Sequence, residues 1–504
     1  MLNLSPARKL HGFFASFTLL LVAALISLAV PAAPAAKSGD EVNPYPETPE
    51  EIAAYKEHLT EKYHEQICNY PEEAVEISTL KELFEYAAKS GVHVKMEPGV
   101  YEIGVDNCEE LWEGGKYLLE FSGIHSFYDL RGVEMRIDSV LQPTHSFKEE
   151  VGISGDHLIM QGLTVTMVGN YPHRDLSSTP IGGTFGQKGD NNLIQGVTIN
   201  SRGSYPYGYQ TALHVYKKWN FSNVPKRRAV AATGQNNVYM DVDIYHRGNG
   251  HALSWAGDVA HTWIDCDIQG KVRLSDDILK NTGGGFYDDP SALPKNFDLS
   301  EHLSSGKIIP LCEDAFRSYG GGKRLKVLGC TIKSLRDAFK RGSYETVFLS
   351  HVTVRGVRNG PFLTAGSQMT RIVNCKVGML CGYIMRRLSD GAEVDITLLP
   401  PDPGILPSHS EKTKRQAIRR FISRKKRSGW ITGDQSEVVL RAGKGLNMDK
   451  LKSRAPFVVD GKDIYLRNET TLPVKLSHDS RNCKIITRSE VTDNGQENEI
   501  KYIE

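Results

Sequence analysis

The sequence predicts an all-β chain that winds into a solenoid, and two observations lead to this prediction. A short motif recurs, in which a small or polar residue leads into a strand that ends on Ile or Val. The residues that end these strands are Val165, Ile199, Ile244, Ile268, Ile332, Val354 and Val377. Successive anchors lie 34, 45, 24, 64, 22 and 23 residues apart, mostly in the range of stacked repeats. The longer gaps are expected to hold insertions.

Strand geometry explains why such a motif favours stacking. Side chains alternate between the two faces of a strand, so Cys266, Cys330 and Cys375 share a face with their anchors. One coil cannot bury this face alone, whereas coils about 4.8 Å apart bury it in a continuous core. These cysteines are therefore read as small buried hydrophobic residues. A propeller is the alternative, although its blades need about 40–45 residues each.

The domain boundaries follow from composition. Residues 37–77 read as a linker with a short helix, and residues 78–504 as one solenoid domain with an insertion near 400–430. Apolar residues at helical spacing predict a helix from Thr79 to Ser90, which would cover the exposed edge of the first coil. The segment Lys412–Arg427 has nine basic residues and no acidic one, which predicts a basic helix. It is interpreted as a clamp for an acidic glycan, a membrane-surface helix or a solvated helix.

The N-terminus predicts the compartment. Arg8 and Lys9 precede an apolar run from 13 to 30, and small residues follow to 36. This pattern is typical of a secretory signal peptide over residues 1–36, with an uncleaved signal anchor as the alternative. We therefore expect a secreted or periplasmic protein without stable membrane insertion after cleavage. In an exported protein, Cys68 and Cys108 are a candidate disulfide pair.

The charge balance excludes some partners. There are 61 basic and 60 acidic residues, giving a net charge of +1, and no nucleic-acid-binding module is recognisable, so no nucleic-acid partner is expected. The hydrophobic content of 40% is that of a globular chain, not of a disordered one. No Cys or His cluster has the spacing of a structural zinc site.

Several segments carry a family resemblance. The opening "STLKELFEYAAKSGVHVKMEPGVYEI" and the repeats "NNLIQGVTI", "KVLGCTI" and "RIVNCKV" resemble the pectin-lyase-like superfamily over roughly residues 78–500. The resemblance implies a right-handed parallel β-helix. It does not imply one reaction, because that superfamily includes lyases, hydrolases, epimerases and proteins without activity.

A second set of short strands is expected after the anchors and contains the candidate catalytic residues. The segments "TALH", "HALS", "DILK", "DAFR" and "DAFK" align, so their polar residues are expected on neighbouring coils. Stacked carboxylates repel, which leaves one protonated and one ionised, as glycoside hydrolysis requires. The predicted catalytic residues are Asp276, Asp277, Asp314, Asp337, His251, Arg317 and Lys340. The elements "GNGHALS", "SDDIL" and "EDAF" resemble those of polygalacturonases, in reversed order and without an Asn-Thr-Asp motif.

Basic residues in the same coils indicate a second chemistry. A lyase must neutralise the carboxylate of a uronic acid and remove the neighbouring proton, for which Lys, Arg, His and Tyr are suited. The residues predicted to bind substrate are His214, Lys271, Arg273, Tyr319, Arg336 and Arg341. No cofactor is certain from the sequence, and calcium held by Asp and Glu is the candidate if the protein is a lyase.

The sequence therefore predicts a secreted carbohydrate-active enzyme that cleaves an acidic polysaccharide, either uronate-containing or sulfated. Hydrolysis by paired carboxylates is the leading interpretation, and β-elimination is the first alternative. A non-catalytic glycan-binding or adhesin solenoid is the second. Acids and bases concentrate between residues 246 and 341, which favours an enzyme. Each acid taken alone is equally well explained as a turn residue that bonds the backbone.

Overall fold

The computed structural model describes most of the chain after residue 41. The described residues are 42–170, 182–202, 227–280, 305–340, 344–356, 367–378, 383–385, 387–402, 404, 406, 408–422 and 428–504. Asn43–Glu504 forms one compact unit. The predicted signal peptide lies outside the described residues, and no helix within them is long and apolar enough to cross a membrane.

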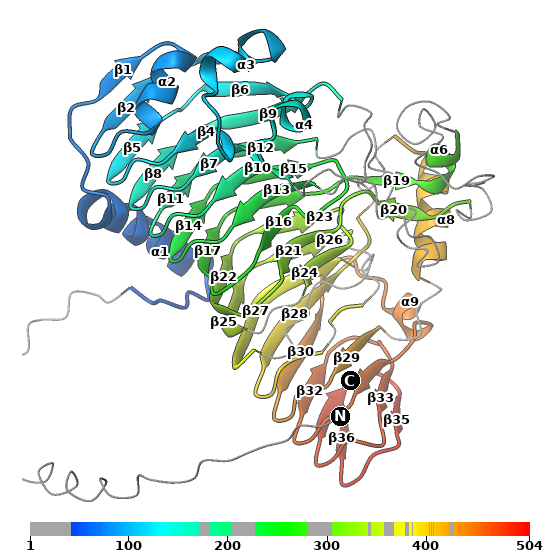
Figure 1. The fold of residues 1–504 in the computed structure, drawn as a ribbon. Helices are drawn as coiled ribbons and strands as arrows, with labels where there is room; N and C mark the ends of the chain where they lie inside the picture. Colours follow the sequence, from blue (N-terminus) through cyan, green and yellow to red (C-terminus); the bar gives the residue numbers. More distant parts are fainter. Residues whose placement is uncertain are drawn as a thin grey trace, which may run out of the picture. The chain divides into compact units, whose positions relative to one another are not determined.

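Two long ladders of parallel strands run along the solenoid (Figure 1). The first ladder consists of β1 (Val75–Ile77), β2 (His93–Met96), β5 (Ser126–Asp129), β8 (Leu158–Gln161), β11 (Leu193–Gln195), β14 (Asn237–Met240), β17 (Ala260–Ile264), β22 (Gly322–Leu328), β25 (Tyr344–Ser350), β27 (Met369–Gly378), β28 (Glu393–Leu399), β30 (Glu437–Ala442), β32 (Tyr465–Asn468), β34 (Lys484–Thr487) and β36 (Glu499–Tyr502). The second consists of β3 (Gly99–Ile103), β6 (Val133–Asp138), β9 (Thr164–Val168), β12 (Thr198–Ser201), β15 (Asp243–His246), β18 (Asp267–Gln269), β23 (Thr331–Lys333) and β26 (Thr353–Arg355), and it joins β27.

Two shorter parallel sheets and one hairpin complete the strands. The seven-stranded sheet has the order β24 (Asp337–Lys340), β21 (Asp314–Ser318), β16 (Leu253–Trp255), β13 (Arg227–Ala232), β10 (Gly182–Gln187), β7 (Glu149–Ile153) and β4 (Tyr117–Phe121). The four-stranded sheet near the C-terminus contains β29 (Gly429–Ile431), β31 (Phe457–Val459), β33 (Val474–Leu476) and β35 (Val491–Asp493). The strands β19 (Val272–Leu274) and β20 (Ile308–Pro310) pair antiparallel. The prediction of a parallel β-helix is confirmed.

The predicted anchors lie where the motif placed them. Ile199 pairs in register with Val165 and with Ile244, and Ile268 continues the row. These side chains are at most 1% exposed and belong to one continuous apolar core. The cysteines beside the anchors are buried free thiols, and so are Cys68 and Cys108. The candidate disulfide between the last two is therefore absent.

The residue that opens each repeat is set by backbone geometry. These residues have φ between 52° and 80°, and they are Gly162, Gly196, Asp241, Asp265, Gly329, His351 and Asn374. Glycine adopts this left-handed region without strain, while Asn, Asp and His tolerate it better than other residues. The small or polar opening of the sequence motif is thus the turn that starts each second-ladder strand.

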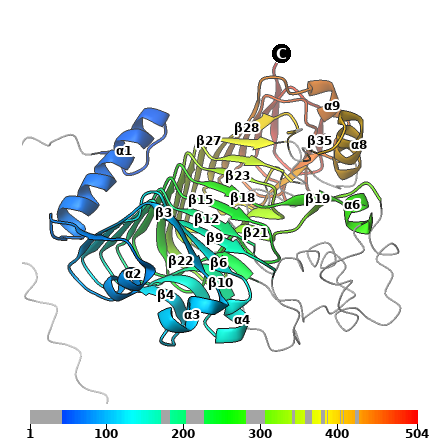
Figure 2. The same cartoon turned by 90° about the horizontal axis from the view of Figure 1, so that it is seen from above.

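Helices cover the start of the solenoid (Figure 2). The predicted capping helix is α2 (Leu80–Ala87), which begins after a capping box between Thr79 and Glu82. It buries Leu83 and Ala87 in the main core. Two short helices follow at the same end, α3 (Val105–Leu111) and α4 (Leu141–His145).

The segment before the first strand forms a long helix on the outside of the first ladder. It contains α1 (Pro49–Lys62) and the π-helix η1 (Tyr63–Ile67). Ile52, Leu59 and Tyr63 pack with eight outward side chains from seven strands of this ladder. Those side chains are Phe127, Ile159, Leu193, Val238, Met240, Ile264, Leu328 and Phe348. A segment that reads as a linker therefore braces many coils at once.

The basic segment forms a helix in an insertion, as predicted. This helix, α8 (Glu411–Ile422), packs Ala417 against Leu274 of β19 and Ile308 of β20. The short helix α6 (Ser275–Lys280) follows β19, and α9 (Met448–Lys452) follows β30. Residues 423–427 of the predicted basic segment lie outside the described residues.

A ladder of buried asparagines connects successive coils between β8 and β14. Asn192 Oδ1 accepts a hydrogen bond from the Leu158 amide at 2.8 Å, and Asn192 Nδ2 donates to the Gly155 carbonyl at 2.9 Å. Asn237 repeats this pattern, bonding the Asn192 amide at 2.8 Å and the Gly189 carbonyl at 3.0 Å. These side chains satisfy turn groups that the strand ladders leave unpaired.

We expect Asn192→Ala to lower the free energy of unfolding by about 2–4 kcal/mol, because two buried backbone groups lose their partners. Chemical denaturation followed by circular dichroism measures this change. The control is Asn494→Ala at an exposed turn, for which we expect no measurable change. Equal stability of the two variants would contradict a structural role for the asparagine ladder.

Candidate active site

The candidate site lies at one end of the seven-stranded sheet, on strands β16, β21 and β24. Asp314 pairs in register with Asp337, and Arg317 with Lys340. Between them Phe316 and Phe339 point into the core, at 2% and 5% exposed. Parallel strands are about 4.8 Å apart, so the same chemistry is repeated on neighbouring coils.

One arginine holds three carboxylates together beneath this surface. Arg336 Nη1 lies 3.0 Å from Glu313 Oε1, Nη2 lies 2.9 Å from Asp314 Oδ1, and Nε lies 3.4 Å from Asp337 Oδ2. The Arg336 side chain is only 13% exposed. Burial acts to lower the pKa of Arg336, but the three carboxylates outweigh it and raise the pKa. Arg336 was predicted to bind substrate, yet its donors face the protein's own acids.

The two aspartates in register differ in how they titrate. Burial acts to raise the pKa of Asp314, but His251, Arg336 and Lys340 outweigh it and hold this pKa well below its usual range. Burial and the Asp314 carboxylate together raise the pKa of Asp337 to about 6. Asp314 is therefore ionised while Asp337 retains its proton only in mildly acidic solution.

His251 joins this acidic cluster to an exposed tyrosine. Its Nε2 lies 2.5 Å from the Tyr319 hydroxyl, and its Nδ1 lies 3.3 Å from Asp314 Oδ2. Glu313 Oε2 is also 3.3 Å from Nε2. The tyrosine is 60% exposed, whereas His251 is 8% exposed. Burial raises the pKa of Tyr319, and the neighbouring Arg317 guanidinium partly offsets that effect.

Two cations lie beside the carboxylates of the cluster: Lys340 is partly exposed, whereas Arg317 is largely buried, at 15% exposed. Lys340 is 31% exposed, and its Nζ lies 3.5 Å from Asp337 Oδ2. Arg317 lies over the Tyr319 ring at 4.7 Å from its centroid, with Nη1 3.8 Å from Asp314 Oδ2. The site therefore has buried acids below and Arg317, Lys340 and Tyr319 above, which favours an anionic ligand.

The structure places four predicted site residues elsewhere. Asp276 and Asp277 are in α6, which Figures 1 and 2 show apart from β21 and β24. Asp276 accepts a hydrogen bond from the Gly306 amide at 2.9 Å, and Asp277 lies 2.9 Å from His409 Nε2. The prediction that "DILK" forms a strand of the carboxylate column is wrong, because the preceding residues form the β19–β20 hairpin instead.

Of the remaining predicted site residues, two lie in or next to β19 and two lie outside the described residues. Arg273 is in β19 and donates to the Asp277 carbonyl at 3.2 Å, and Lys271 directly precedes that strand. His214 and Arg341 lie outside the described residues. The sequence analysis did not include Glu313, which contacts His251, among the site residues. The position of Glu313 directly before Asp314 in "EDAF" was the signal that could have identified it.

The arrangement does not fit calcium. The carboxylates of Glu313, Asp314 and Asp337 face the Arg336 guanidinium, which occupies the place that a cation would take. Among the described residues, no group of three or more His, Cys, Asp or Glu is arranged to hold a metal ion. The calcium considered from the sequence therefore has no site in this cluster.

Comparisons with known proteins give structural likenesses only. No family model matches the chain, and no curated protein matches it. Among solved structures, a mannuronic-acid-specific polysaccharide lyase of family 6 from the human gut microbiota is similar over 85% of this chain and 83% of its own, at 11% identity and a TM-score of 0.33. Pectate lyase Pel9A is similar over 82% and 72%, at 12% identity and a TM-score of 0.24. The reaction of this chain has to be argued from its own side chains.

The raised pKa of Asp337 predicts a pH dependence of stability. A folded-state pKa of about 6 exceeds the unfolded value of about 3.9, so the folded state binds more protons between pH 4 and 6. Stability from this group is therefore lost as pH rises through that window, by about 3 kcal/mol at most. We expect Asp337→Asn to remove this loss, as measured by denaturant unfolding from pH 4 to 7. Asp449→Asn, at a side chain that is 89% exposed, is the control. Parallel curves for Asp337→Asn and the unmodified protein would contradict the assignment.

Proposed function

We propose that the protein is an exported polysaccharide lyase that cleaves an acidic, uronate-containing polysaccharide by β-elimination. The observation that carries this proposal is the chain of contacts Asp314–His251–Tyr319 beside the cations Arg317 and Lys340. Export is proposed from the sequence of residues 1–36 alone.

Elimination places three demands on a site. The carboxylate of the uronic acid must be neutralised, the proton on the adjacent carbon removed, and the leaving glycosidic oxygen protonated. The carbon–hydrogen bond breaks, its electrons form a carbon–carbon double bond, and the bond to the leaving oxygen breaks. Lys340 is suited to the first demand because its side chain is 31% exposed, and Arg317, at 15% exposed, adds positive charge beside the Tyr319 ring.

The Tyr319–His251 pair is suited to the proton transfers. In this proposal the proton of His251 is assigned to Nδ1, 3.3 Å from the ionised Asp314, so that Nε2 accepts the hydrogen bond from the Tyr319 hydroxyl. In the reaction the tyrosine proton passes to Nε2, and Asp314 and Glu313 stabilise the resulting imidazolium. The phenolate, beside Arg317, then removes the proton from the sugar. The imidazolium is the reservoir from which the leaving oxygen is protonated.

Hydrolysis is the second candidate, and the opposed pKa values of Asp314 and Asp337 favour it. An ionised base next to a protonated acid is the pairing that glycoside hydrolysis uses. Both carboxylates, however, are at most 7% exposed and are engaged by Arg336. Asp314 is placed to support His251, and Asp337 faces Arg336 and Lys340, so neither is arranged for direct contact with a sugar. A non-catalytic glycan-binding solenoid is the remaining alternative.

We expect Tyr319→Phe and His251→Ala each to lower turnover by about 10²-fold or more, because each removes one partner of the proton transfer. The assay is ultraviolet absorbance of the unsaturated product together with reducing-end release, on a panel of uronate polymers. Tyr502→Phe is the matched control, since this tyrosine is 62% exposed on the last strand. Melting temperatures of all variants separate loss of activity from unfolding.

The same panel distinguishes the alternatives. Reducing ends without ultraviolet absorbance, with activity lost in Asp314→Asn and kept in Tyr319→Phe, would establish hydrolysis and overturn elimination. Binding without either signal would leave a glycan-binding protein.

A further inference from the structure

The outward surface of the seven-stranded sheet continues from the candidate site toward the first coils (Figure 1). In register beside Lys340 and Arg317 stand four small residues on the next four strands. They are Ser254, Ala231, Gly186 and Gly152. Small residues leave space above the sheet, in which side chains from neighbouring coils can lie. Two groups of side chains occupy this space.

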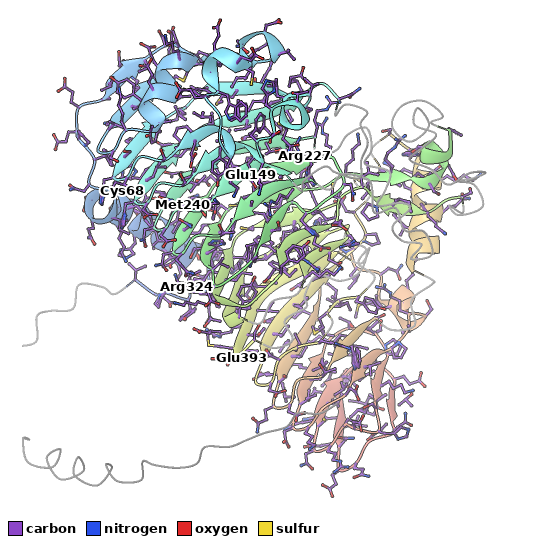
Figure 3. The ribbon with its side chains drawn as sticks, viewed as in Figure 1. Cys68, Glu149, Arg227, Met240, Arg324 and Glu393 are labelled. Atoms are coloured by element: carbon purple, nitrogen blue, oxygen red, sulfur yellow. The ribbon has the colours of Figure 1, made fainter. Side chains whose placement is uncertain are left out.

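The first group is an ion pair that lies across one whole strand. Arg228 Nη2 on β13 is 2.9 Å from Glu149 Oε1 on β7, with β10 between them. A Cβ at Gly183 of β10 would lie 3.0 Å from Arg228 Cγ and 3.4 Å from Glu149 Cγ. Arg228 Nη1 also lies 3.4 Å from Ser254 Oγ. Arg228 is 26% exposed and Glu149 2%, so the guanidinium is the exposed member of this neutral pair, two coils from Arg317 (Figure 3 labels Glu149).

The second group is a pair of lysines over one buried tyrosine. The Tyr117 ring covers Gly152 and Gly186, where an added Cβ would lie 2.2 Å and 2.9 Å from ring atoms. Lys116 Nζ and Lys188 Nζ lie 5.5 Å and 5.6 Å from the centroid of this ring. No ion pair is found for either lysine within the described part of the chain. Burial and the nearby Lys188 lower the pKa of Lys116 to about 8.

Two ammonium groups at one aromatic face repel each other, and an anion bound between them relieves this repulsion. The lysine pair lies over β7 and its neighbours, about four strands from β21, which is about 19 Å at 4.8 Å per strand. Arg228 lies between the two positions. Basic side chains therefore recur along the solenoid axis on the face that bears the candidate site, with Arg228 paired to Glu149 and Glu120 ending the row beside Gly152.

We propose that Lys116 and Lys188 over Tyr117 form a distal subsite for a carboxylate or sulfate group of the polysaccharide, and that the chain runs from there past Arg228 to Arg317 and Lys340. This inference rests on the proposed function for the identity of the ligand. It adds that the protein binds a long acidic chain in preference to a short one.

The test compares chain lengths in the full protein. The double variant Lys116→Gln with Lys188→Gln should raise KM for a uronate decasaccharide about tenfold, since two partly exposed ion pairs are worth about 1–2 kcal/mol together. Turnover number, and KM for a trisaccharide, should not change. Lys475→Gln with Lys501→Gln, at exposed lysines of β33 and β36, is the matched control. Equal effects on both chain lengths, or no effect on the decasaccharide, would overturn the proposal.

Titration calorimetry keeps this result separate from the proposed reaction. If no acidic glycan is turned over, the proposed function fails, while weaker decasaccharide binding by the double variant alone would still support the distal subsite. A uronate decasaccharide and a sulfated decasaccharide without uronate distinguish the two sources of negative charge. Binding of neither by the unmodified protein, or equal binding by all variants, overturns the subsite.

Discussion

In-register hydrogen bonding between coils is the constraint on which the rest of the structure depends. Each strand pairs with its counterpart one coil away, so every turn and every outward side chain is stacked on its equivalent. This is why the left-handed turn recurs from Gly162 to Asn374, and why Asn192 and Asn237 make the same bonds. It also stacks charge, because Asp314 and Asp337 cannot avoid each other once their strands pair. Arg336, which directly precedes Asp337, offsets the repulsion that this register creates.

The separation of charge by depth follows from that arrangement. Acids near the core must be paired, since an isolated buried charge is costly, and the guanidinium of Arg336 engages one oxygen of each. Lys340 is consequently left partly exposed, with the largely buried Arg317 near it, as the cation that a polyanion would meet first. His251 connects the buried acids to the exposed tyrosine, because one ring nitrogen faces Asp314 and the other contacts the Tyr319 hydroxyl. A sugar at Tyr319 would be coupled to a carboxylate that it never contacts.

The repeat could be predicted from the sequence because its pattern is local. Much of the candidate site could not, because it depends on contacts between residues that are distant in the sequence. Anchors such as Ile199 and Ile268 follow from period-two alternation and spacing, and Phe316 and Phe339 from the "DAF" segments. The prediction for Asp277 was wrong because a four-residue pattern cannot distinguish a strand from a helix. The helix α6 directly follows β19, and β19 pairs with residues 308–310, which are distant in the sequence. The role of Arg336 was equally hidden, since it depends on the register between two coils. Tyr319 and His251 are 68 residues apart, and only their coils bring them together.

The helix α1 changes how such a solenoid behaves as a whole. Stacked repeats interact only with their neighbours and are able to unravel from either end. Here Tyr45 meets Phe348, and the Glu47 carbonyl accepts hydrogen bonds from His351 and Asn374, about three hundred residues further along. Lys56 meanwhile joins the turns of two middle coils through Asp241 and Asp265. These contacts join coils that do not touch one another, so the loss of one end of the stack also disrupts contacts in its middle. We therefore expect this solenoid to unfold more cooperatively than a stack held together by neighbouring coils alone.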